Sequence, residues 1–134
     1  MRKLLSLLTQ LTTRWLSAEL TFAHEITLIV SSFSILALAA TYPLMLDLGG
    51  VLPNDLGDPV LNTWILAWDA DRLLHGLNGL WTAPMYFPYE ATLAYSENLL
   101  GIAIFTAPLQ WLTGNPVLVY NVAFLASFVL AGTG

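Results

Sequence analysis

Asp58 stands in the stretch LGDPVLNTW, residues 56–64, where it directly precedes a proline. This pattern is typical of a helix start, with the aspartate as N-cap and the proline in the first turn. The same carboxylate, held at a membrane surface, has the chemistry of a general base that accepts a proton from a sugar hydroxyl. We therefore expect Asp58 to begin a helix, and both roles stay open for its side chain.

Three further ionisable residues are candidate binding residues. Arg72 is the only basic residue between Asp47 and Glu97, so it is the candidate for holding a phosphate or pairing with a neighbouring acid. His75 follows Asp71 at a spacing that lets the two share a hydrogen bond on a helix. Glu97 borders an apolar segment, where an ionisable group is costly unless it is hydrated or paired.

These residues also have purely structural interpretations. Asp69, Asp71 and Arg72 form a charge cluster, which on a helix is usually a solvated face. His75 suits the end of a helix, and Glu97 suits the headgroup zone near the positive N-terminal end of the next helix. The residue types alone do not decide between these roles and substrate binding.

Other kinds of site find little support in the sequence. The acidic region offers oxygen ligands for a divalent cation, but without a spacing specific for a metal. Zinc-binding and phosphate-loop patterns are missing, and the chain has no cysteine. The net charge of −5 does not favour nucleic acid. We therefore expect no cofactor, no metal and no nucleic-acid partner.

The composition is that of an integral membrane protein. Hydrophobic residues make up 57% of the chain and charged residues 10%, and the mean hydropathy is +0.69. A soluble domain carries about 25% charged residues, which clothe its surface. The sequence predicts an all-α membrane protein with about three transmembrane helices, because a bilayer-crossing segment of roughly 20 apolar residues must be helical. The expected spans are residues 26–46, 96–113 and 116–134.

The last two spans are joined by TGNP, residues 113–116, which has turn chemistry. Asn115 is expected to cap the third span, and Pro116 fits its first position. So short a turn predicts an antiparallel helical hairpin. The second span is the shortest, and Pro108 is expected to kink it.

The N-terminal segment, residues 1–25, is expected to be an amphipathic helix on the inner membrane face, with one apolar stripe formed by Leu4, Leu8, Leu11 and Trp15. A frayed leader is the plainer alternative. A cleaved signal peptide is another, because Ala37-Leu38-Ala39 fits a cleavage pattern. The basic residues before the first span place the N-terminus in the cytoplasm and residues 47–95 outside.

The outer loop, residues 47–95, contains a predicted juxtamembrane helix at residues 59–76. Its apolar stripe is expected to rest on the outer membrane surface or to pack against other helices, and consists of Leu61, Trp64, Ile65 and Trp68. An extended, aromatic-rich connection follows. Its rings suit stacking on a sugar or a lipid, or an interface belt: Trp81, Tyr86, Phe87 and Tyr89.

The order of elements resembles the N-terminal part of bacterial polytopic glycosyltransferases of the GT-C superfamily. The resemblance covers most of residues 26–134 and is carried by a first span, GDP, a tryptophan-rich helix, the Phe87-Pro88 turn and LTGNPVLVYN. It implies a polyprenyl-phosphate sugar as donor, an extracytoplasmic glycan, lipid or protein as acceptor, and the bacterial plasma membrane as location. It also implies that Asp58 is the catalytic base or the carboxylate that orients the acceptor.

Members of that superfamily have many more spans than three. The resemblance therefore implies that this chain is an N-terminal portion that is inactive by itself. Two other classes of function stay open. One is a non-catalytic membrane subunit or scaffold that docks through a small-residue face formed by Gly101, Ala103 and Ala107. The other is the first part of a transporter, with Glu97 as a coupling carboxylate.

Overall fold

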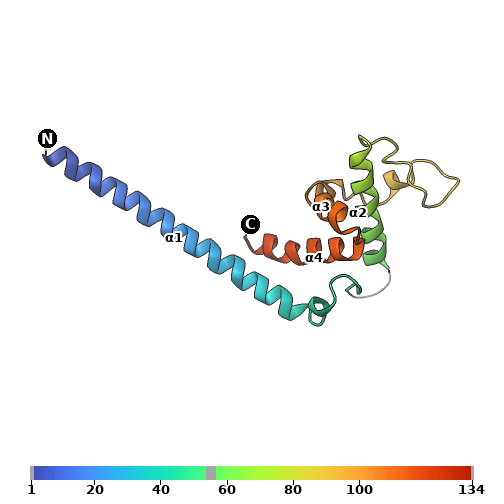
Figure 1. Ribbon diagram of the computed structural model, residues 1–134, viewed down its shortest axis with the longest axis horizontal. Helices are drawn as coiled ribbons and strands as arrows, with labels where there is room; N and C mark the ends of the chain where they lie inside the picture. The colour runs from blue at the N-terminus through green and yellow to red at the C-terminus, as the bar shows by residue number, and fades with distance from the viewer. Residues whose placement is uncertain (1, 54–56, 134) are drawn as a thin grey trace.

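The computed structural model describes residues 2–53 and 57–133, and in the first helix it describes the side chains of Gln10 and of residues 21–40. The described chain is all-helical, without strands (Figure 1). Its elements in order are α1 (Arg2–Ala40), the 3-10 helix η1 (Leu44–Leu46), α2 (Asp58–Leu74), the 3-10 helix η2 (Thr92–Tyr95), α3 (Leu100–Thr113) and α4 (Pro116–Thr133).

The predicted N-terminal helix and first span form one continuous helix, α1, of 39 residues (Figure 1). The predicted stripe of Leu4, Leu8, Leu11 and Trp15 lies outside the described side chains. Helix α1 ends at Ala40, before the predicted boundary at Leu46. The reason is Pro43, which lacks an N–H group and disfavours helical backbone in the residue before it.

Two helices have the length and composition of membrane spans, namely Thr21–Ala40 within α1 and Pro116–Thr133, which is α4. Only 6% and 11% of their apolar windows are buried within the chain, whereas the core helix of a soluble domain is mostly covered. Helix α3 has 14 residues and rises about 21 Å, less than the roughly 30 Å of a hydrocarbon core. Within the described residues, two helices thus have span length, and the predicted count of three spans is not confirmed.

Helix α4 folds back along the C-terminal part of α1, and the two run antiparallel (Figure 1). Gly132 of α4 lies against the ring of Phe33, and a Cβ at Gly132 would overlap that ring. Phe124 and Phe128 line a largely apolar hollow of about 570 Å³ together with residues 40–44 and 51–53. The absence of a side chain at Gly132 therefore permits the close approach of the two helices.

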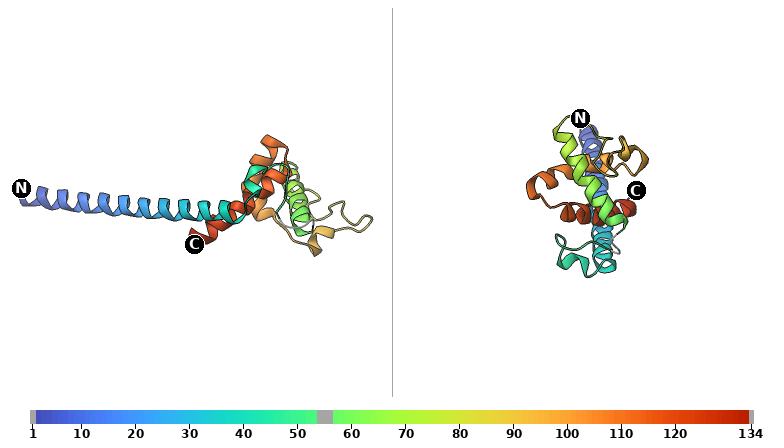
Figure 2. Two further views of the ribbon diagram at one scale, coloured as in Figure 1. Left: turned by 90° about the horizontal axis from the view of Figure 1, so that it is seen from below. Right: turned by 90° about the vertical axis from the view of Figure 1, so that its right-hand side faces the viewer.

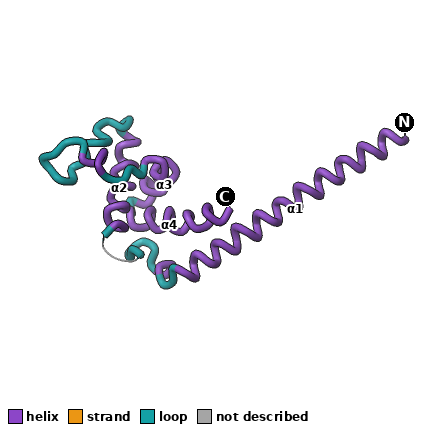
Figure 3. Tube along the Cα trace, turned by 180° about the vertical axis from the view of Figure 1, so that it is seen from behind, coloured by secondary structure: helices purple, strands orange, loops and turns teal. Residues whose placement is uncertain are grey.

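Helices α2 and α3 form a second layer across one end of the α1–α4 pair (Figures 1 and 2). The turn before α4 is as predicted: Gly114 has a left-handed φ of 62°, and the Asn115 Oδ1 accepts a hydrogen bond of 3.0 Å from the Leu118 N–H. The predicted antiparallel hairpin does not form. Helix α3 is seen nearly end-on where α4 lies across the view, so the two meet at a steep angle (Figure 3). Helix α3 instead buries Ala103 and Ala107 in the packed layer that it forms with α2.

The apolar stripe of α2 is packed inside the protein. Ile65 is completely buried in a cluster that also contains Leu80, Ala83 and Leu93 from the following loop. The indoles of Trp64 and Trp68 stack with 5.9 Å between ring centroids, and the Trp68 Nε1–H donates to the Leu80 carbonyl. Of the two predicted environments for this stripe, the structure provides packing against the protein.

Two asparagines of the α4 region fasten the loop that follows η1. The Asn121 Nδ2 donates to the carbonyls of Leu48 and Val51 at 2.9 and 2.7 Å. The Asn115 Nδ2 donates to the Gly49 carbonyl at 3.0 Å. Because Asn121 is completely buried, these bonds tie the chain between α1 and α2 to the side of α4.

We expect the replacement Asn121→Leu to lower the free energy of unfolding by about 1–2 kcal/mol, because it leaves two carbonyls without their donor. The measurement is a denaturant titration in detergent micelles, followed by tryptophan fluorescence. Asn78→Leu is the matched control, since Asn78 is exposed and its side chain bonds only locally, to the His75 carbonyl. Equal stability of the two variants would contradict a tethering role for Asn121.

Candidate functional site

Asp58 is the first residue of α2, and Gly57 occupies the N-cap position. The predicted helix start is confirmed to within one residue, but the expected capping role falls to a residue without a side chain. Asp58 is exposed and lies in the first turn, where the positive end of the helix favours a negative charge. Its carboxylate is therefore open to solvent, where a general base can reach the hydroxyl of an acceptor.

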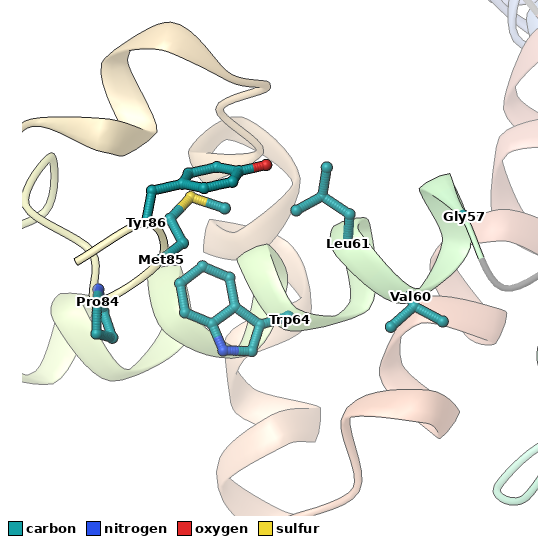
Figure 4. Close-up of a pocket in the computed structure, with 7 residues that line it drawn as sticks. All are labelled: Gly57, Val60, Leu61, Trp64, Pro84, Met85 and Tyr86. Atoms are coloured by element: carbon teal, nitrogen blue, oxygen red, sulfur yellow. The ribbon is translucent and has the colours of Figure 1, made fainter. Parts of the chain in front are cut away.

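A groove of about 530 Å³ follows α2 from Gly57, the residue before Asp58 in the chain (Figure 4). In Figure 4, Tyr86 and Met85 lie on one side, opposite Trp64, and Gly57 lies at the end where α2 begins. The lining is mostly apolar and aromatic, and consists of Gly57, Val60, Leu61, Trp64, Pro84, Met85 and Tyr86. An apolar and aromatic lining of this kind is common in small-ligand sites, and Asp58 follows its first lining residue in the chain.

Tyr120 is a polar residue on the helix that packs against α2. It lies in the second turn of α4 and is half-buried. Its ring is held by stacking on Phe124, with 6.1 Å between ring centroids. The sequence did not indicate Tyr120 as a residue near α2.

Arg72 is far from Asp58 and is already engaged. It lies about four turns further along α2, roughly 20 Å along the axis. Its Nε and Nη2 bond to the Asp71 carboxylate, its Nη1 donates to the Asn78 carbonyl, and its guanidinium lies 4.5 Å from the centroid of the Trp68 ring. A phosphate would have to displace Asp71 to be bound by Arg72.

Neither His75 nor Glu97 lines the groove. His75 is the C-cap residue of α2, and its Nδ1 lies 2.8 Å from the Asp71 carbonyl oxygen and 3.6 Å from the Asp71 carboxylate. Glu97 is exposed and accepts a hydrogen bond of 3.2 Å from the Ser96 hydroxyl. Asp71, Arg72 and His75 thus form a local cluster at the end of α2, whereas the groove starts at the beginning of that helix.

Asp69 departs most from expectation. The sequence assigned it to a solvated charge cluster, but its exposed fraction is 0%. Neither carboxylate oxygen has a partner with hydrogen-bond geometry within the described residues. Burial raises its pKa from 3.8 to about 6, and the nearby backbone N–H of Leu99 partly offsets that rise. The prediction of a solvated face is therefore wrong for Asp69, although it holds for the half-exposed carboxylate of Asp71.

The spacing of α2 already contained a signal for this burial. Asp69 follows Leu66 and precedes Leu73 at helical intervals, so an apolar stripe runs through it. Other buried side-chain acceptors without a partner in the described part are the Asn62 Oδ1, the Gln110 Oε1 and the Asn121 Oδ1. None of these residues was singled out from the sequence, because polar residues are mostly exposed in proteins.

The described residues contain no group of three or more His, Cys, Asp and Glu side chains that would hold a metal ion. No protein-family model, curated protein or solved structure matches this chain. The geometry around Asp58 and the order of the helices along the chain are therefore the features that bear on function.

Proposed function

We propose that this chain forms the N-terminal portion of an integral membrane glycosyltransferase of the GT-C type. The enzyme moves a sugar from a polyprenyl-phosphate donor to an extracytoplasmic acceptor. It resides in the bacterial plasma membrane, with the N-terminus in the cytoplasm and residues 47–95 outside. The observation that carries the proposal is the exposed carboxylate of Asp58 at the start of α2, next in the chain to Gly57, which lines an aromatic groove.

Two features support this placement. The chain contains two helices of span length and composition, and α2 lies across the end of the pair that they form (Figure 1). Asp58 and the groove are therefore close to the place where the apolar helices end. A carboxylate there meets an acceptor from water and a lipid-linked donor from the membrane.

In the proposed reaction, Asp58 accepts the proton of the acceptor hydroxyl as that oxygen attacks the anomeric carbon of the donor sugar. The bond between the anomeric carbon and the phosphate oxygen breaks, and the polyprenyl phosphate leaves with the bonding electron pair. Direct displacement inverts the anomeric configuration. Because Asp71 neutralises Arg72, the cation that stabilises the leaving phosphate comes from a part of the enzyme other than the described residues.

The test is a transfer assay with the intact membrane protein that contains this chain. Membranes from cells expressing it are supplied with radiolabelled hexosyl and pentosyl polyprenyl phosphates. We expect label to move from at least one donor into a polymer, lipid or protein fraction, and no transfer in membranes without the protein. Release of label to water alone, or no turnover of any donor, would refute the proposal.

The two other classes of function lose support from the packing. The small-residue face expected to dock a partner includes Ala103 and Ala107, and both are already buried in the layer of α2 and α3. A coupling carboxylate in a transporter is expected to be shielded from bulk water, whereas Glu97 is exposed. The positions of Ala103, Ala107 and Glu97 therefore support neither a scaffold nor a transporter.

A further inference from the structure

The loop between α2 and α3 encloses a second hollow, next to the groove. It has a volume of about 450 Å³ and is lined by Tyr86, Tyr89, Glu90, Thr92, Tyr95 and Ser96. Tyr86 lines both spaces, so the two adjoin through its ring. We call this second space the tyrosine hollow. It contains none of the residues that the proposed mechanism uses.

The tyrosine hollow has the surface chemistry that a sugar requires. The side chains of Tyr86, Tyr89 and Tyr95 are 74%, 75% and 90% exposed, so their ring faces are available to the C–H faces of a pyranose. Their phenol groups both donate and accept hydrogen bonds. The Glu90 carboxylate accepts only, and its two oxygens can take two neighbouring hydroxyl donors.

Charge decides which hydroxylated ligand fits. No lysine, arginine or histidine is among the residues that line the tyrosine hollow, and Glu90 is negative. A phosphate group would meet repulsion there without any compensating cation. A neutral sugar carries no charge that Glu90 would repel. The hollow therefore suits an uncharged saccharide and not the phosphate end of a lipid-linked donor.

The base of the tyrosine hollow is anchored to the core. The Thr92 hydroxyl donates to the Ala83 carbonyl at 2.9 Å, and the Leu93 N–H donates to the Trp81 carbonyl at 3.1 Å. Leu93 is completely buried in the core cluster beneath. The residues on either side of Leu93 are thus held in place before a ligand arrives, which lowers the entropic cost of binding.

The position of the loop argues against a membrane-interface belt. The loop protrudes on the side away from the long arm of α1, beyond the ends of the two span-length helices (Figure 1). The tyrosines of this loop therefore lie past the ends of the span-length helices and not along their sides. A carboxylate among them also favours water over the hydrocarbon boundary.

We propose that the tyrosine hollow binds one neutral sugar unit, which in the proposed reaction belongs to the acceptor. The assignment to the acceptor rests on the proposed function, whereas the binding itself does not. Rings of Tyr89 and Tyr95 stack on the sugar, and Glu90 accepts hydrogen bonds from its hydroxyls. Tyr86 separates this unit from the groove that leads to Asp58.

The test is an array of immobilised neutral, sialylated and phosphorylated oligosaccharides, probed with the full chain in phosphatidylcholine nanodiscs. We expect binding to neutral glycans at least tenfold above that to acidic ones. Tyr89→Ala and Glu90→Gln are each expected to weaken it at least tenfold. Tyr42→Ala is the matched control, because Tyr42 is an exposed tyrosine near the end of α1, and it should bind as the unmodified chain does.

Three outcomes would overturn the inference: no glycan binding, a preference for acidic glycans, or binding that persists in both variants. Weaker association of Tyr89→Ala with phosphatidylcholine vesicles, without glycan binding, would identify a membrane belt instead. Asp71→Asn, which removes a carboxylate outside both the groove and the tyrosine hollow, should still bind glycans. Glycan binding by a protein that transfers no sugar would leave the tyrosine hollow as a sugar site and refute only the glycosyltransferase proposal.

Discussion

Replacing Asp58 by asparagine is expected to lower the rate of sugar transfer by about 10²–10⁴-fold in the intact protein, because the amide cannot accept the proton of the attacking hydroxyl. Initial rates at saturating donor and acceptor measure the loss. Expression and membrane insertion should be preserved, because the Asp58 side chain is exposed and the N-cap position belongs to Gly57.

Asp71→Asn is the matched control for that experiment. It removes a carboxylate from the same helix, but at the far end and from an ion pair with Arg72. We expect it to keep most of the transfer activity. If Asp58→Asn retained full transfer, Asp58 would serve only to begin α2. If both variants lost activity equally, the loss would reflect the charge of the helix and not a base at its start.

The replacement Asp69→Asn is expected to stabilise the protein by about 1–3 kcal/mol above pH 7. Asparagine has the shape of aspartate without the charge that burial disfavours. The side chain is completely buried, and its pKa is raised to about 6. Denaturant titrations in detergent micelles at pH 7.5 measure the difference.

The pH dependence of the same variant has a defined sign. A folded pKa of about 6, above the ordinary 3.8, means that the folded state holds the proton more tightly. The stability that Asp69 contributes is therefore fully present below about pH 4 and is lost as pH rises through about 6. Asp69→Asn should lack this decline in stability. The difference in free energy of unfolding between the variant and the unmodified protein should therefore grow from pH 4 to pH 7.

Asp71→Asn again serves as the comparison, because the Asp71 carboxylate is half exposed and paired with Arg72. It should change the free energy of unfolding by no more than about 0.5 kcal/mol. A loss of stability in Asp69→Asn at pH 7.5 would contradict an unpaired buried carboxylate. It would point instead to a cationic partner for Asp69 within the membrane preparation.

Local sequence rules predicted the helices well where the signal is local. The start of α2 at Asp58, the turn at Gly114 and the first position of Pro116 each depend on neighbouring residues, and each is confirmed to within one residue. The all-helical class followed from long apolar segments. The end of α1 was misplaced because hydropathy continues past Ala40, whereas the backbone constraint of Pro43 stops the helix earlier.

The features that the sequence did not predict depend on which helices and loops pack against one another. The burial of Asp69 and the tether made by Asn121 arise from contacts among α2, α3, α4 and the loop after η1, which helical periodicity does not specify. The steep angle between α3 and α4 is likewise a packing result. Arg72 was expected near the chemistry because it is the only cation in its region, and the length of α2 separates it from Asp58.

The contact between Gly132 and Phe33 fixes the depth of α4 relative to α1. Counting back along the antiparallel pair from that contact, the middle of α4 falls opposite the end of α1, and Phe124 and Ala40 line the same apolar hollow. The midpoint of Thr21–Ala40 is therefore staggered from that of α4 by about ten residues, roughly 15 Å, or half a hydrocarbon slab. A flat bilayer of ordinary thickness cannot be centred on both. Matching both helices requires tilt or local thinning of the lipid around them.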